Sequence, residues 1–148
     1  MARNHISIGN CGEYFVAAEL ERHGFTVALP LSNVEKFDIL AIERSTQRQI
    51  AVQVKTTQHQ RKEWILSEKN ESIIGDDIFY RFVSLSGLEQ PNYYIVPSTI
   101  VAAYIKQDAE QWLHATGRKG QEHKYTPIRK FRVTDDTYKD NWTLLMNN

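Results

Sequence analysis

Two segments of the chain have apolar residues at the spacing of an amphipathic helix. The first covers residues 9–24, with apolar side chains every three to four positions and a glycine at its end. The second covers residues 99–117, where Ser98 or Thr99 is the expected N-cap. Because this spacing collects the apolar side chains on one face, and glycine is a frequent stop signal, both segments are predicted to be helices.

Runs of β-branched and aromatic residues predict several strands. The clearest runs are residues 25–30, 37–43, 49–57, 78–87 and 92–98, the last two separated by a turn at 88–91. Only the polar sequence "RSTQR" separates the second run from the third, which favours an antiparallel hairpin.

The remaining segments have weaker patterns. Residues 58–77 are polar, with a candidate strand at 62–68 and a loop or short helix at 70–77. The tail, 125–145, holds one short strand-like piece and a Tyr138/Trp142 pair expected to pack on the core. The order is therefore a helix, three strands, an uncertain stretch, two strands, a helix and a tail, which predicts an α/β or α+β fold with a mixed central sheet.

Length and composition predict one globular domain. The 148 residues are 41% apolar and 24% charged, and we expect a single domain over 1–148 with a core at roughly 9–116 and a basic extension at 117–148. No apolar run approaches the ~20 residues that cross a bilayer, and the N-terminus lacks the apolar centre of a secretory signal. We therefore expect no membrane association and a cytoplasmic protein. The single cysteine, Cys11, excludes an internal disulfide and is interpreted as a small residue at a helix start.

Charge is balanced overall, with 18 basic and 18 acidic residues, but one segment is strongly basic. Between positions 118 and 132 only Glu122 opposes six basic residues. These are Arg118, Lys119, Lys124, Arg129, Lys130 and Arg132. Such a segment is either a solvated surface or a surface that contacts nucleic-acid phosphates, and the sequence leaves both open.

The hairpin carries the polar residues that suggest chemistry. Side chains alternate along a strand, so Gln53 and Lys55 share one face. Asp38 begins the neighbouring strand, and it joins that face if the register sets it opposite Gln53 or Lys55 but not if it faces Val54. The sequence does not fix this register. A carboxylate and an amide oxygen suit Mg²⁺, and a nearby lysine can position an attacking water, as phosphodiester hydrolysis requires.

These residues resemble the PD-(D/E)XK, or restriction-endonuclease-like, nuclease superfamily. The resemblance covers roughly residues 9–100 and includes the upstream "GEYFVAAELERHGF". It implies an α-β-β-β-α-β core with a mixed sheet and C-terminal additions. It also implies a site that binds Mg²⁺ or Mn²⁺, a DNA substrate and a homodimer. The implied catalytic residues are Glu13, Asp38, Gln53 and Lys55, with Glu13, Asp38, Gln53 and the main-chain carbonyl of Val54 as metal ligands.

The chain departs from the family pattern at two positions. Phe37 stands where a proline usually precedes the aspartate, and Gln53 replaces the commoner acid, which removes one negative charge from the metal site. A catalytically inactive module that binds nucleic acid or a protein partner is therefore the alternative. A third possibility is an interaction protein of a toxin-immunity or phage-defence locus.

Each site residue also has an ordinary structural interpretation. Glu13 could be a solvated acid favoured by the helix dipole at a helix start, and Glu19 competes with it for the helix position. Asp38 could simply begin a strand, and Gln53 with Lys55 could lie on the exposed face of an edge strand.

Overall fold

The computed structural model describes residues 5–30 and 37–145, which form two α-helices, seven strands and two 3-10 helices. In chain order these are α1 (His5–Arg22), β1 (Phe25–Ala28), β2 (Ile39–Glu43), β3 (Gln49–Thr57), β4 (Glu63–Ser67), η1 (Glu68–Ser72), β5 (Ile78–Ser86), β6 (Glu89–Pro97), α2 (Ser98–His114), β7 (Ile128–Arg132) and η2 (Trp142–Leu144). The predicted element order is confirmed, and the uncertain stretch contains β4 and η1. Residues 31–36, with the sequence "LSNVEK" and a predicted turn or loop between the first two strands, lie outside the described residues.

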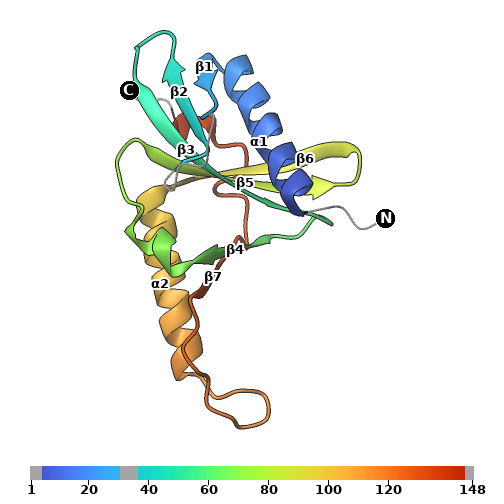
Figure 1. Cartoon of the computed structure of the whole chain (residues 1–148), viewed down its shortest axis with the longest axis vertical. Helices are drawn as coiled ribbons and strands as arrows, with labels where there is room; N and C mark the ends of the chain where they lie inside the picture. The colour runs from blue at the N-terminus through green and yellow to red at the C-terminus, as the bar shows by residue number, and fades with distance from the viewer. Residues whose placement is uncertain (1–4, 31–36, 146–148) are drawn as a thin grey trace.

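A five-stranded sheet in the order β1-β2-β3-β5-β6 forms the centre of the molecule. Its strands are antiparallel except for the β3–β5 pair, which is parallel, so the predicted mixed sheet is confirmed. Helix α1 lies across one side of this sheet (Figure 1). The two-stranded β4–β7 sheet and α2 lie on the other side, with α2 pointing away from the sheet (Figure 1).

Two hydrophobic clusters fill the spaces on either side of the sheet. Under α1, side chains such as Val16, Ile39 and Val52 form the first cluster. On the opposite side, Trp64 and Phe82 belong to the second, together with residues of α2 and β7. The side chains of β5 alternate between these clusters, as strand geometry requires, whereas Ile50, Val52 and Val54 of β3 all belong to the first cluster.

The hairpin between β2 and β3 has a register that places Asp38 next to Gln53. Ile39 pairs with Val52 and Leu40 with Ala51, so the same register continued by one position sets Asp38 opposite Gln53. This is one of the registers that put the carboxylate on the polar face of β3.

Helix α1 begins four residues earlier than its pattern predicts, at His5. Cys11 consequently lies inside the helix, and the expectation that it marks a helix start is wrong. The N-cap of α2 is Pro97, so neither Ser98 nor Thr99 fills the expected role. The Ser98 hydroxyl instead donates to the Gly75 carbonyl at 3.0 Å and accepts from the Gly75 amide at 3.1 Å, which ties α2 to the segment before β5.

The β5–β6 turn is shorter than predicted. Ser86 pairs with Glu89, so only Gly87 and Leu88 turn the chain. Gly87 has φ of +57°, in the left-handed region that glycine adopts without steric cost. Pro91 lies within β6, which tolerates it because β6 is an edge strand.

The tail packs on the rest of the molecule. Strand β7 pairs with β4 in antiparallel register, from Glu63 opposite Arg132 to Ser67 opposite Ile128. Tyr138 packs on the second cluster and Trp142 on the first, which confirms the expected packing of this pair. Within the described ranges, neither α-helix is long and apolar enough to cross a membrane.

Candidate active site

Asp38 lies where the pairing of β2 with β3 ends. Its amide donates to the Val52 carbonyl at 2.9 Å, and its Oδ2 accepts the Val54 amide at 2.8 Å. The carboxylate thus satisfies a β3 amide that no longer has a β2 carbonyl opposite it. This bond holds the half-buried side chain in place. Asp38 therefore does more than begin a strand, which was the alternative interpretation of this residue.

Gln53 and Lys55 lie on the face of β3 that is turned away from α1. Their parallel neighbours on β5 are Tyr80 and Phe82, both members of the second cluster. Gln53 is only 8% exposed, and its Oε1 is buried with no hydrogen-bond partner in the described part of the chain. Since β3 is bonded to strands on both sides, the interpretation of these residues as an exposed edge-strand face is wrong.

Glu13 comes to Asp38 from α1. The helix begins at His5, so Glu13 lies in its third turn and not at the start where the dipole would favour an acid. The charge of Asp38 contributes to the raised pKa of Glu13, which places the two carboxylates within electrostatic reach. The competing Glu19 acts instead on Arg81 and Tyr93. Of the two helix acids, Glu13 is therefore the one beside Asp38.

A close contact between α1 and β3 fixes the helix next to the site. A Cβ added to Gly12 would lie 1.8 Å from the Thr56 Oγ1, so only glycine lets the helix approach this far. Glu13 follows Gly12 directly, and Thr56 follows Lys55. This contact therefore sets the distance between the two chain segments that carry Glu13 and Lys55.

The two carboxylates are in an environment that disfavours their charged forms. Burial raises the pKa of Asp38, although the Val54 amide and the Lys55 charge act in the opposite direction. Burial, followed by the Asp38 charge, raises the pKa of Glu13. Neighbouring acids with raised pKa values are stabilised in their ionised form by a cation placed between them.

The donor set fits a hard divalent cation with few protein ligands. Asp38, Glu13 and the Gln53 side-chain oxygen, which accepts no hydrogen bond in the described part of the chain, supply the oxygen atoms that such ions prefer. No group of three or more His, Cys, Asp or Glu residues that could hold a metal occurs in residues 5–30 and 37–145, in keeping with the replacement of one acid by Gln53. Mg²⁺ commonly retains several waters, so two carboxylates and an amide are a sufficient protein contribution.

Sequence reasoning missed a second layer of residues behind the site. Tyr80 is fully buried, and its hydroxyl accepts a 2.8 Å hydrogen bond from the Asn70 amide. Burial raises the pKa of Tyr80 to about 12, with a smaller contribution from Asp38. The phenol therefore stays protonated beside Gln53. Its place on β5 follows from the strand pairing, for which the sequence carries no local signal.

The basic segment divides into two groups. Arg129, Lys130 and Arg132 lie on β7 and pair with acids, with 3.3 Å from Arg129 Nη2 to Glu71 and 2.6 Å from Arg132 Nε to Glu63. The other group, Arg118, Lys119 and Lys124, is exposed in the loop between α2 and β7. No ion pair involves this second group within the described part of the chain. The structure thus does not present the six residues as one free basic surface.

Comparison with known proteins supports the fold. No protein-family model and no curated protein matches the chain. The bacterial homing endonuclease I-Ssp6803I is similar in structure, with 14% identity, a TM-score of 0.58, and coverage of 97% of this chain and 92% of its own. Hjc, a Holliday junction resolvase from the archaeon Archaeoglobus fulgidus, has 14% identity, a TM-score of 0.47, and coverage of 84% and 83%. The first likeness shows that this chain has a nuclease-like α/β fold.

Proposed function

We propose that the protein is a metal-dependent nuclease that hydrolyses phosphodiester bonds in DNA. The proposal is supported by the electrostatic interaction of Asp38 with Glu13 and with Lys55, which lie on three separate segments. It is also supported by the Gln53 oxygen on the same strand as Lys55, which has no hydrogen-bond partner in the described part of the chain. The fold shared with a homing endonuclease supports it.

The proposed cation is Mg²⁺ or Mn²⁺, held by Asp38, Glu13, the Gln53 oxygen and the Val54 carbonyl. When bound, the cation would supply Lewis acidity toward a phosphate oxygen. Asp38 is held in position by the Val54 amide, and Lys55, whose charge acts on Asp38, would hold and orient the attacking water. Val52 and Val54 pack under α1 and keep the strand rigid beneath these groups.

DNA binding is assigned to the exposed loop residues Arg118, Lys119 and Lys124, joined by Lys130, which is held only by a 3.8 Å ion pair with Glu63. Such contacts weaken with salt. Arg129 and Arg132 are the least available of the six predicted residues, because each is engaged with acids of the same chain. A homodimer that cuts both strands remains part of the proposal.

A plasmid-nicking assay tests the proposal. Purified protein is incubated with supercoiled plasmid and Mn²⁺, beside a Lys55→Ala variant and a matched Lys62→Ala variant whose lysine is exposed and has no role in the proposed site. We expect nicking by the wild type and by Lys62→Ala. In Lys55→Ala the nicking rate should fall at least about a hundredfold, which is the usual rate contribution of one general acid–base group.

The alternative is an inactive module that keeps the fold and binds without cutting. The replacement of an acid by Gln53 and the balanced net charge favour it. Absence of nicking together with salt-sensitive DNA binding would support this alternative. Equal nicking by the wild type and Lys55→Ala would refute the assigned site.

A further inference from the structure

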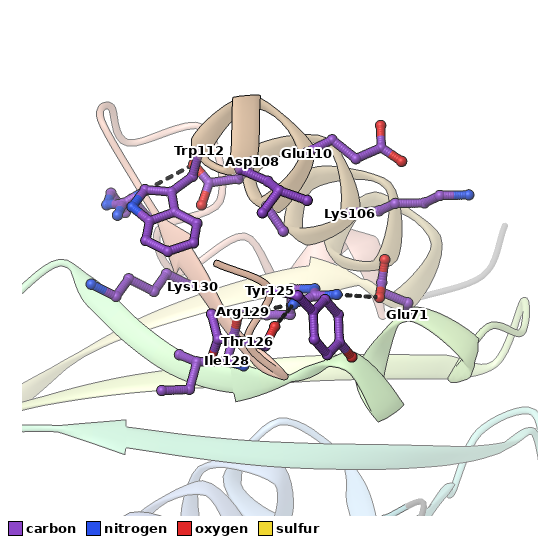
Figure 2. A pocket seen from close by; sticks show the side chains of 13 residues that line it. Glu71, Lys106, Asp108, Glu110, Trp112, Tyr125, Thr126, Ile128, Arg129 and Lys130 are labelled. Carbon is purple, nitrogen blue, oxygen red and sulfur yellow. Dashed lines mark hydrogen bonds and ion pairs between the residues drawn. The ribbon is translucent and has the colours of Figure 1, made fainter. Parts of the chain in front are cut away.

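A cavity of about 360 Å³ lies at the far end of α2, away from the candidate active site. The second half of α2 forms one wall, and the segment that leads into β7 forms the other (Figure 2). Its volume is at the small end of the range for ligand sites in proteins, which suits one planar ring with an attached sugar better than a folded peptide.

Two aromatic side chains line this cavity while remaining solvent-exposed. Trp112 of α2 is 44% exposed and Tyr125 of the connecting loop is 63% exposed. The His123 ring stacks on the Trp112 indole with a centroid distance of 4.0 Å and an interplanar angle of 2°. His123 does not line the cavity, so the cavity lies against the part of the indole that His123 leaves uncovered.

The aromatic rings are fixed in place before any ligand binds. His123 Nδ1 is 2.6 Å from the Trp112 carbonyl, which holds the stacked pair together. The Tyr125 hydroxyl donates to the Glu68 carboxylate, which ties the loop to η1. Preset rings lose little conformational entropy when a ligand stacks on them.

Two arginines that line the cavity are already compensated by groups of the same chain. Arg129 is bonded to the carbonyls of Thr126 and Ile128 and to Glu71, as Figure 2 shows. Arg132 is paired with Asp108 at 2.9 Å. These two arginines are therefore not free to bind a phosphate inside the cavity.

Free basic groups surround the cavity instead. Lys106 lines it and makes no ion pair within the described residues, and the loop that joins its two walls carries Arg118, Lys119 and Lys124. Among the acids of the same segments, Glu110, which also lines the cavity, and Glu122 make no ion pair within residues 5–30 and 37–145. The cavity thus combines an apolar aromatic interior with an excess of positive charge around it, which complements a base on a phosphate backbone.

We propose that this cavity binds one unpaired nucleobase of the DNA on which the proposed nuclease acts. The inference rests on that proposed function. It is consistent with the layout of the fold, because Gln53 and Lys55 face the side of the sheet on which α2 and β7 lie. The helix from Ser98 to Trp112 is about 21 Å long, which corresponds to about six nucleotide steps of a strand. A DNA strand of that length spans α2 from the sheet to the cavity.

Binding of two labelled DNA duplexes tests the inference. They share one sequence, but one is fully paired and the other carries a single unpaired adenine. Fluorescence anisotropy is measured in EDTA at one fixed salt concentration, where no metal-dependent cleavage occurs. We expect the wild type to bind the bulged duplex about tenfold more tightly, as the stacking of one base on an aromatic ring predicts.

Three cavity variants and one control variant identify the cavity as the source of this preference. Trp112→Ala and Tyr125→Ala should reduce it to less than about threefold while keeping the affinity for the paired duplex. Trp112→Phe retains a ring and should keep most of the preference. Tyr14→Ala removes an aromatic ring that is 62% exposed on α1 and should change nothing. Circular dichroism verifies that each variant is folded.

Other outcomes overturn the inference. Equal binding of the two duplexes by the wild type, or a preference that survives both alanine substitutions, would exclude a base site here. Failure to bind either duplex would do the same. A change of oligomeric state in Trp112→Ala without a change in base preference would assign the cavity to a contact between copies of the chain. Because binding is measured without metal, none of these results depends on whether plasmid is nicked.

Discussion

The contact of Gly12 with Thr56 gives the most direct test of how the fold positions the site. Replacing Gly12 with alanine adds a Cβ 1.8 Å from the Thr56 Oγ1 and 3.0 Å from the Thr56 Cβ. Rotation of the threonine side chain can remove the first clash, but it cannot move the Cβ. An ordinary contact needs 3.4–4 Å, so α1 and β3 have to separate by roughly 0.4–1 Å.

Two effects of opposite sign determine the stability of Gly12→Ala. Overpacking of this kind costs about 1–3 kcal/mol, whereas alanine in place of glycine inside a helix gains about 1 kcal/mol. The net change is between about zero and 2 kcal/mol of lost unfolding free energy. Gly9→Ala is the matched control, because Gly9 lies on the same helix and an added Cβ meets nothing within 4 Å. That variant should gain up to about 1 kcal/mol.

Urea denaturation followed by far-UV circular dichroism measures both variants. Because the gain in helix propensity cancels between them, the difference of about 1–3 kcal/mol is the cost of the α1–β3 contact, or about 2–12 °C in Tm. Nicking activity should also fall, since a displacement of about 1 Å next to a catalytic group can cost about a hundredfold in rate. Equal stabilisation by Gly9→Ala and Gly12→Ala would refute the reasoning.

Three further predictions concern buried polar groups. Because the pKa of Asp38 is raised in the fold, its protonated form stabilises the metal-free protein below the ordinary value of 3.8, and this stability is lost as pH rises through the raised pKa. In EDTA, Asp38→Asn should therefore be more stable than the wild type at pH 7 but no more stable near pH 3. Urea denaturation measures both. Gln53→Glu restores an acid and should lower the Mn²⁺ concentration for half-maximal nicking while lowering metal-free stability; an unchanged metal requirement would argue against Gln53 as a ligand. Arg81 is fully buried with no hydrogen-bond partner in the described chain, and burial lowers its pKa to about 10, but its guanidinium lies 4.2 Å from the Trp142 ring centroid. Arg81→Met should leave the unfolding free energy unchanged or raise it by about 1–2 kcal/mol, whereas a loss above about 2 kcal/mol would show that the cation–π contact dominates.

The elements that sequence predicts best are those whose burial leaves a direct mark on residue type. Strand β3 runs from Gln49 to Thr57, the bounds predicted for it, because the burial of Ile50, Val52 and Val54 under α1 selects β-branched residues on one face of the strand. The secondary structure of β4 and η1 is harder to predict from the sequence, since the side chains of this segment alternate between the second cluster and solvent. The sequence does not determine the register of the hairpin, because the register depends on the geometry of the turn after Glu43.

The candidate site was predictable in residue type but not in placement. Asp38, Gln53 and Lys55 are polar interruptions of apolar runs, and such interruptions are visible in sequence. Glu13 could not be separated from Glu19 without knowing which turn of α1 faces Asp38. The pairing of Arg129 and Arg132 with acids far along the chain was likewise invisible, because ion pairs across a fold leave no local pattern.

The hydrogen bond from the Val54 amide to Asp38 gives the site a reporter of its own. A backbone proton held by a carboxylate changes its NMR chemical shift when that carboxylate gains a proton or a cation. A ¹⁵N-labelled sample titrated with Mg²⁺ would therefore register occupancy through a single β3 resonance, without any substrate and without turnover.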